Sequence, residues 1–204
     1  MQKYDVQKLS HQEQQHYIAQ HLHTIDVICQ KRLHGKGIGI NVLASKGRVI
    51  SLNINKRIHQ PKNGGGSSYR RTAKKIPLSL LEIATQITNR LHWSGVMMIE
   101  LLETQEGFYL IEINPRFWGS LALTEFSGAN FVRNFYRLQV GKKLLPSRGK
   151  EVTARHLIND LKWQVRNPKP RSLLTFLLSL LEWHCDMSNT MLNESWILNP
   201  HCTK

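Results

Sequence analysis

Two carboxylates and an amide in the middle of this chain have the spacing of metal ligands. The stretch YLIEINPRFWGSL, residues 109–121, alternates apolar and polar side chains, as a β-strand does. A strand here places Glu112 and Asn114 on one face, with Ile111 and Ile113 on the other. A second predicted strand, GVMMIELLE at residues 95–103, precedes it and carries Glu100.

These two strands predict a hairpin that brings the two glutamates together. A loop at residues 105–107, with glycine in its last position, puts Glu100 opposite Glu112. Like charges directly opposite one another destabilise a sheet unless a cation compensates for them. Two carboxylates and the amide oxygen of Asn114 suit Mg²⁺, whose remaining ligands a nucleotide's phosphates can supply. The alternative is a register shift of one residue, which separates the glutamates and leaves them solvated.

The residues of this hairpin resemble a known family. GVMMIELLETQEGFYLIEINPRFWGSL is similar to the end of the ATP-grasp fold, found in biotin carboxylase, carbamoyl-phosphate synthetase and many carboxylate–amine ligases. The resemblance implies that Glu100 and Glu112 are bridging carboxylates for two Mg²⁺ ions and that Asn114 is the third ligand. It implies that Arg116, just after the strand, faces the reacting phosphate, where a guanidinium offsets developing negative charge. ATP and Mg²⁺, or Mn²⁺ in its place, are the implied cofactors.

A segment upstream resembles the adenine-binding hinge of the same family. In CQKRLHGKGIGINVLASKGRV, the residues along the adenine edge would be Gln30, Lys31, Arg32 and Leu33. Lys31 stands where the family has a glutamate, and Arg32 where it has a tyrosine. Backbone contacts to the base would survive these differences, whereas the side-chain contacts to the base are in question.

A basic loop resembles the phosphate- and substrate-covering loop of uncharacterised ATP-grasp ligases. This loop reads NKRIHQPKNGGGSSYRRT, and its candidate phosphate-binding residues are Lys56, Arg57, His59 and Arg70. The alternative for each of them is an ordinary solvated charge on the surface.

Composition limits the classes of partner and compartment. The chain has 204 residues and a formal net charge of +14, from 28 Lys and Arg against 14 Asp and Glu. This balance suits an anionic partner, whether a nucleotide, a nucleic acid or a membrane surface. The 3 cysteines (Cys29, Cys185, Cys202) are odd in number and lack metal-ligand spacing. We therefore expect a reducing, cytoplasmic setting and no disulfide framework.

The elements that must position the candidate residues follow from periodicity and turn signals. Helices are predicted at residues 6–23, 77–93, 125–139 and 172–184, the last too short to span a bilayer, which takes about 20 residues. Strands are predicted at residues 25–30, 38–44, 49–58, 95–103, 107–114 and 151–158. Residues 45–48 form a tight turn, and residues 59–72 a glycine- and serine-rich loop.

Together these elements predict an α+β fold of the ATP-grasp type, its C-terminal subdomain, with an antiparallel sheet packed on helices. Residues 1–24 are a helical lead-in, 25–158 the C-terminal portion of an ATP-grasp domain, and 159–204 a helical C-terminal extension. The family's phosphate-binding lysine precedes the adenine hinge, and residues 1–26 do not supply it, so we expect the N-terminal lobe to be absent. The chain would then be a fragment, a decayed copy, or a split-gene product whose missing lobe a separate chain supplies.

The implied function is that of the Mg²⁺-ATP-binding part of a ligase. Such an enzyme activates a small carboxylate substrate as an acyl phosphate, which an amine then attacks. We expect weak or absent activity from the chain on its own. The alternative is a truncated or decayed, non-catalytic basic module on an ATP-grasp scaffold, with nucleic acid as its partner.

Overall fold

The computed structural model describes residues 10–21, 33–59, 69–73, 75–147 and 149–166, together with residues 178 and 185–186. The chain divides into two compact units, Met1–His34 and Gly35–Lys204. The three-part division expected from the sequence stays a prediction. Within the described part, no helix is both long and apolar enough to cross a membrane.

The first unit contains helix α1 (His11–His21), which lies inside the helix predicted at residues 6–23. Its first turn is closed by a reciprocal capping box. The backbone N–H of Ser10 donates to Glu13 Oε2 at 2.6 Å, and the N–H of Glu13 donates to Ser10 Oγ at 3.4 Å. The hydrogen bonds from Ser10 hold the pKa of the Glu13 carboxyl below its usual value. The strand predicted at residues 25–30 falls outside the described residues.

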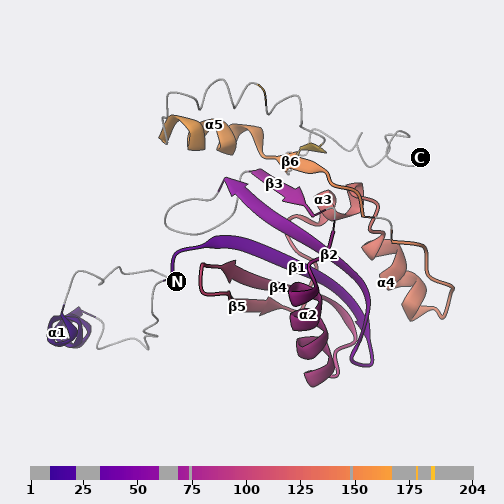
Figure 1. Ribbon diagram of the computed structural model, residues 1–204, viewed down its shortest axis with the longest axis horizontal. Coiled ribbons are helices and arrows are strands. Elements are labelled where there is room, and N and C mark those ends of the chain that lie inside the picture. The colour runs from indigo at the N-terminus through magenta and orange to yellow at the C-terminus, as the bar shows by residue number, and fades with distance from the viewer. Residues whose placement is uncertain are drawn as a thin grey trace. The chain divides into compact units, whose positions relative to one another are not determined.

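The second unit is built on a seven-stranded sheet with the order β5-β4-β1-β2-β3-β6-β7 (Figure 1). The strands are β1 (Lys36–Ser45), β2 (Arg48–His59), β3 (Tyr69–Thr72), β4 (Gly95–Glu103), β5 (Phe108–Asn114), β6 (Thr153–Arg155) and β7 (Cys185–Asp186). In this order every neighbouring pair is antiparallel except the last, in which β7 runs parallel to β6. The helices are α2 (Leu78–Arg90), α3 (Leu121–Phe126), α4 (Phe131–Gln139) and α5 (Leu157–Arg166). The predicted α+β class, with an antiparallel sheet and packed helices, is confirmed.

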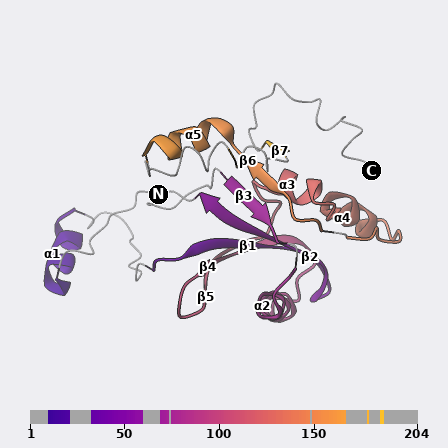
Figure 2. The same cartoon turned by 45° about the horizontal axis from the view of Figure 1, so that its top comes forward.

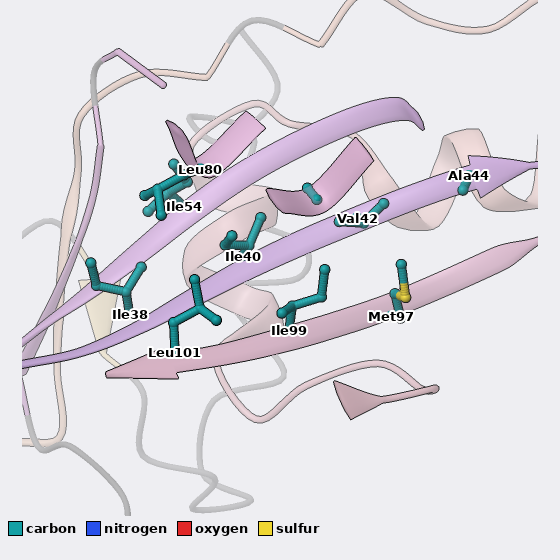
Figure 3. Packing of buried hydrophobic residues seen from close by; sticks show 10 residues of the cluster. Ile38, Ile40, Val42, Ala44, Ile54, Leu80, Met97, Ile99 and Leu101 are labelled. Carbon is teal, nitrogen blue, oxygen red and sulfur yellow. The ribbon is translucent and has the colours of Figure 1, made fainter. Parts of the chain in front are cut away.

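One face of the sheet packs against α2. Alternate residues of β1 and β4 point to this face, as the two-residue period of a strand requires. They include Ile38, Ile40 and Val42 of β1 and Met97, Ile99 and Leu101 of β4, all buried (Figure 3). The helix contributes Leu80 and Ala84, which lie one turn apart on its buried side.

The opposite face of the sheet packs against α3 and α4 (Figure 2). Its apolar part is a cluster around Leu43, Trp118 and Phe131. The rings of Trp118 and Phe131 meet edge to face with centroids 5.2 Å apart, a favoured aromatic geometry. Strand β1 is therefore covered on both sides, and all of its residues from Gly37 to Ala44 are buried.

The tight turn predicted at residues 45–48 is confirmed. Strands β1 and β2 are joined by Lys46 and Gly47, with Ser45 opposite Arg48. Both turn residues have positive φ, 48° and 77°. Two consecutive residues in this region form the hairpin turn whose twist matches that of the strands.

Several predicted elements were wrong in extent. The loop expected at 59–72 ends in strand β3, because Tyr69–Thr72 pair with β2 on one side and β6 on the other. The strand expected at 151–158 is limited to Thr153–Arg155, and residues 157–166 form α5 instead. Tyr69–Thr72 is too short and polar to show a strand periodicity, so its conformation depends on pairing with distant strands.

The helix predicted at 125–139 is two helices. Residues 121–126 form α3 and residues 131–139 form α4. Between them, Gly128 and Asn130 take positive φ values of 83° and 54°, which interrupt a right-handed helix. The helix predicted at 77–93 likewise stops at Arg90, because His92 takes a φ of 46°. The helix predicted at 172–184 falls almost entirely outside the described residues.

The start of α4 depends on the half-buried carboxylate of Glu125. Glu125 Oε1 accepts hydrogen bonds from the backbone N–H groups of Phe131, at 2.6 Å, and Val132, at 3.4 Å. These bonds favour the charged form, but burial outweighs them and raises the pKa of Glu125 above its ordinary 4.5. The folded protein therefore carries a desolvation penalty once this carboxyl ionises.

We predict that replacing Ile99 by Ala lowers the free energy of unfolding by about 2–5 kcal/mol, because it leaves a cavity in the core. Ile99 is fully buried between β1 and α2. Its matched control is Ile111→Ala in the neighbouring strand, where the side chain is 55% exposed and a change within about 0.5 kcal/mol is expected. Denaturant unfolding measures both, and equal losses would contradict this core assignment.

We predict that Glu125→Gln gains stability relative to the wild type as pH rises. The folded-state pKa is raised, so the penalty is absent below the unfolded value and fully present above the folded one. Glutamine keeps the Oε1 acceptor for α4 and never ionises. The difference in unfolding free energy between variant and wild type should increase from pH 4 to pH 8, and Glu82→Gln, at an exposed position of α2, is the control for the change of residue type. A flat difference for Glu125→Gln would refute the prediction.

Candidate functional site

The residues predicted for the metal site lie on the sheet face opposite α2. On β4, Ile99 and Leu101 point into the core (Figure 3). Glu100 lies between them in sequence and therefore points to the other face. The strand thus places its carboxylate outside the apolar core, on the side where α3 and α4 pack.

The predicted pairing of the two glutamates is confirmed. Glu100 lies directly opposite Glu112, and Met98 lies opposite Asn114. The turn that produces this register differs from the expected one, since Glu103 rather than Thr104 pairs with Phe108. A register shift between Glu100 and Leu101, which leaves Ile111 without a partner in β4, then restores the expected pairing.

Glu112, Asn114 and Arg116 form a chain of contacts at the end of β5. Asn114 Nδ2 donates to Glu112 Oε1 at 2.7 Å, and Arg116 Nη2 donates to Asn114 Oδ1 at 3.2 Å. Arg116 Nη1 also donates to the carbonyl oxygen of Phe117 at 3.0 Å. These bonds hold the guanidinium beside the amide, and the Glu112 carboxylate lies exposed to solvent at the sheet edge.

Glu100 forms an ion pair with Arg57 of β2, the strand two places away in the sheet. The side chains of the pair are only 13% and 15% exposed. Arg70 of β3 lies opposite Arg57 and donates from Nη1 to Ser120 Oγ at 3.4 Å. Burial, and then the charge of Arg57, lower the pKa of Arg70 to about 10, while Glu100 acts in the opposite sense. Positive charge is therefore crowded around Glu100.

Two glycines allow Arg57 to reach across β1. Gly39 lies opposite Glu100 on one side and Asn55 on the other. Gly37 is on the same face, two residues before it, next to the position of Arg57 in the register. A Cβ at Gly39 would lie in contact with Met98 Sδ, at 3.4 Å. The absence of side chains leaves the space that the guanidinium crosses.

Lys56 does not join this group. It pairs with Ile38, which points to the face covered by α2. The Lys56 side chain therefore lies on the α2 face, away from Glu100, and is exposed. Arg57 and Lys56 therefore lie on opposite faces, and only Arg57 is near Glu100. Of the predicted adenine-hinge residues, Gln30, Lys31 and Arg32 fall outside the described residues. Leu33 is half-buried and belongs to the first unit.

A buried polar layer beside the site was missed by the sequence analysis. Asn41 Nδ2 and Asn55 Nδ2 donate to Thr124 Oγ1 at 3.2 and 3.1 Å, and Trp118 Nε1 donates to the same oxygen at 3.1 Å. Asn55 Nδ2 also lies 3.0 Å from Ser120 Oγ. The signal was present in the sequence, because Asn53 and Asn55 alternate with apolar residues as Glu112 and Asn114 do.

His59 lies farther along β2 in a different cluster. Its Nδ1 contacts Asp160 Oδ1 of α5, and its ring stacks on Trp163 with centroids 4.1 Å apart. Asp160 also lies 2.8 Å from Arg155 of β6, and both of these side chains are fully buried. The cluster attaches α5 to the sheet, and the sequence analysis did not include Asp160.

The donor chemistry of the glutamate pair fits a hard divalent cation. Two carboxylates and an amide on adjoining strands offer oxygen ligands of the kind that Mg²⁺ and Mn²⁺ bind. Across the described ranges no group of three His, Cys, Asp or Glu residues forms a metal cluster. A cation here would therefore be held by few protein ligands, which leaves positions for a ligand's own oxygens.

Comparison with known proteins gives a family match. The sequence model of the family described as "ATP-grasp in the biosynthetic pathway with Ter operon" matches residues 23–161, a range that includes every candidate site residue. No curated protein matches the chain.

Solved structures with partial similarity include carboxylases. Biotin carboxylase from Campylobacter jejuni, crystallised as a β,γ-ATP complex, is 20% identical, with a TM-score of 0.47 over 58% of this chain and 28% of that one. Multifunctional pyruvate carboxylase from Rhizobium etli is 17% identical, with a TM-score of 0.47 over 59% and 12%. The biotin carboxylase domain of a thermophilic 2-oxoglutarate carboxylase is 19% identical, with a TM-score of 0.45 over 58% and 28%. The chain thus spans only a minor part of each of these proteins.

We predict that Thr124→Val destabilises the protein by about 2 kcal/mol or more, because buried N–H donors lose their acceptor while side-chain volume is kept. Three such donors converge on Thr124 Oγ1. The control is Thr85→Val on the exposed side of α2, which is expected to change stability by about 0.5 kcal/mol or less. Thermal or denaturant unfolding decides, and a neutral Thr124→Val would contradict the importance of the polar layer.

Proposed function

The chain belongs to the ATP-grasp family of the biosynthetic pathway with Ter operon, and from this membership we propose that it is the Mg²⁺-ATP-binding part of a carboxylate–amine ligase. The coarser statement, an ATP-binding domain of ligase type, follows from the family itself. The observation that supports the finer proposal is the opposed pair Glu100 and Glu112, with Asn114 beside it and Arg116 adjacent.

In this proposal each residue around Glu100 and Glu112 has a role in binding ATP. Glu112 and Asn114, with Glu100, would hold the metal, which when bound neutralises the phosphate oxygens of ATP. Arg116 would orient the transferred phosphoryl group and offset its charge, and the bond to Asn114 fixes its guanidinium for this purpose. The backbone of residues 30–33 would contact adenine. The remaining positive charge of Arg57 and Arg70 would attract the anionic reactants.

The proposed reaction needs no protein nucleophile. An oxygen of a small carboxylate substrate attacks the γ-phosphorus of ATP, and ADP leaves with the electrons of the broken P–O bond. The resulting acyl phosphate is attacked at its carbonyl carbon by an amine, which loses a proton as phosphate departs. Positioning and charge stabilisation supply the rate enhancement in such a transfer. A separate chain that completes the nucleotide site, and the cytoplasm as the compartment, remain parts of this proposal.

Two observations favour a second candidate. Arg57 already neutralises Glu100, and the chain as a whole carries a net charge of +14. A decayed, non-catalytic basic module that binds nucleic acid would have both properties. Its binding would depend steeply on salt and would not require a divalent cation.

We predict that the protein binds a non-hydrolysable ATP analogue only when Mg²⁺ is present. Because Glu112 would be a metal ligand, Glu112→Gln should weaken this binding by about tenfold or more. Glu82→Gln, an exposed glutamate on α2 at the other face of the sheet, is the matched control and should leave it unchanged. Isothermal titration calorimetry measures all three proteins. The enzyme proposal fails if metal-linked binding is absent while DNA binds with a strong salt dependence.

A further inference from the structure

Arg57 stands where a cation would be expected beside Glu100. Its Nη2 contacts Glu100 Oε1, and this contact neutralises one of the two opposed carboxylates. We propose that Arg57 permanently takes the place of one of two divalent cations, so that this site binds a single divalent cation with each nucleotide. The inference rests on the proposed function and specifies the metal content of that site.

The burial of the ion pair separates it from a surface salt bridge. Exposed pairs are screened by water and exchange readily with bulk ions. Here the side chains of Arg57 and Glu100 are 13% and 15% exposed. A divalent cation that bridged both glutamates would have to displace the guanidinium from Glu100, and breaking a largely buried ion pair is costly.

The sheet is built so that Arg57 reaches Glu100. The two residues are on β2 and β4, with β1 between them, and β1 presents Gly37 and Gly39 on this face. Side chains at those two positions would stand in the path of the guanidinium. A side chain at Gly39 would contact Met98 Sδ from its Cβ onward, at 3.4 Å. Glycine at both positions therefore leaves the space over β1 to the Arg57 side chain.

Charge in the neighbourhood points the same way. Arg70 lies opposite Arg57, and Arg57 contributes, after burial, to lowering the pKa of Arg70. A second divalent cation on the Glu100 side would meet two guanidinium groups at short range, and like charges repel strongly in a partly desolvated site. Glu112 is different, because it is exposed at the sheet edge and accepts a hydrogen bond from the neutral amide of Asn114.

These contacts make the two glutamates of the pair unequal as metal ligands. Glu100 is satisfied by an arginine, and Glu112 with Asn114 remains as the oxygen set for one metal ion. Unlike a bound metal ion, Arg57 is covalently part of the chain and does not dissociate from the protein. The preference for a single metal ion is therefore built into the sequence.

The experiment counts metal ions directly. Equilibrium dialysis with Mn²⁺ and a non-hydrolysable ATP analogue on both sides, followed by elemental analysis, gives the number of Mn²⁺ bound per protein. We expect one for the wild type, one for Arg57→Lys, which retains the charge, and two for Arg57→Met. Lys56→Met, the neighbouring residue on the opposite face, is the control and should leave the count at one.

Each outcome decides the matter. Two Mn²⁺ bound to the wild type overturns the inference and leaves the proposed function intact. One Mn²⁺ bound to folded Arg57→Met also overturns it, because the arginine would then not set the count. If Arg57→Met does not fold by circular dichroism, Arg57→Gln takes its place in the same assay. No Mn²⁺ bound in the presence of the nucleotide overturns the proposed function itself, and the inference with it.

Discussion

The two-residue alternation of β1, β2 and β4 is the constraint on which the rest of this structure depends. It sends Ile40, Ile54 and Ile99 to the face covered by α2 and leaves Asn41, Asn55 and Glu100 on the other. The first face packs as an ordinary apolar core. The second is polar although it is largely buried, because α3 and α4 cover it. The candidate metal ligands and the arginines beside Glu100 lie on that second face.

Buried amide N–H groups on this face need hydrogen-bond acceptors, and α3 with its two flanking serines supplies them. Ser120, Thr124 and Ser127 present hydroxyl oxygens toward three asparagines of β1 and β2. Directional bonds of this kind fix where α3 sits more strictly than apolar contact does. Ser120 Oγ also accepts a hydrogen bond from Arg70, so the position of α3 affects the position of a charged group near Glu100. Fold and site are thus held by one continuous set of polar contacts.

The charges around the glutamate pair determine which ions the site can bind. Opposed carboxylates are unfavourable without compensation, and the chain compensates one of them with its own arginine. This arrangement shows why residue types alone do not specify how many ions a site holds. The guanidinium that competes for Glu100 comes from a strand two places away.

Neighbouring residues specify the limits of β4, the turn at Lys46 and Gly47, and the common face of Glu112 and Asn114. Strand periodicity and short-range turn geometry are local properties, so a single segment reveals them. The pairing of Glu100 with Glu112 was also predicted, but through a different turn, and the bulge at Ile111 restores it. The bulge at Ile111, strand β3, the acceptor role of Thr124 and the ion pair of Arg57 with Glu100 were decided only in the tertiary structure. Each of these depends on which distant segments lie side by side. The energy of a buried polar contact depends on the partner group and on the exclusion of water, and local periodicity specifies neither.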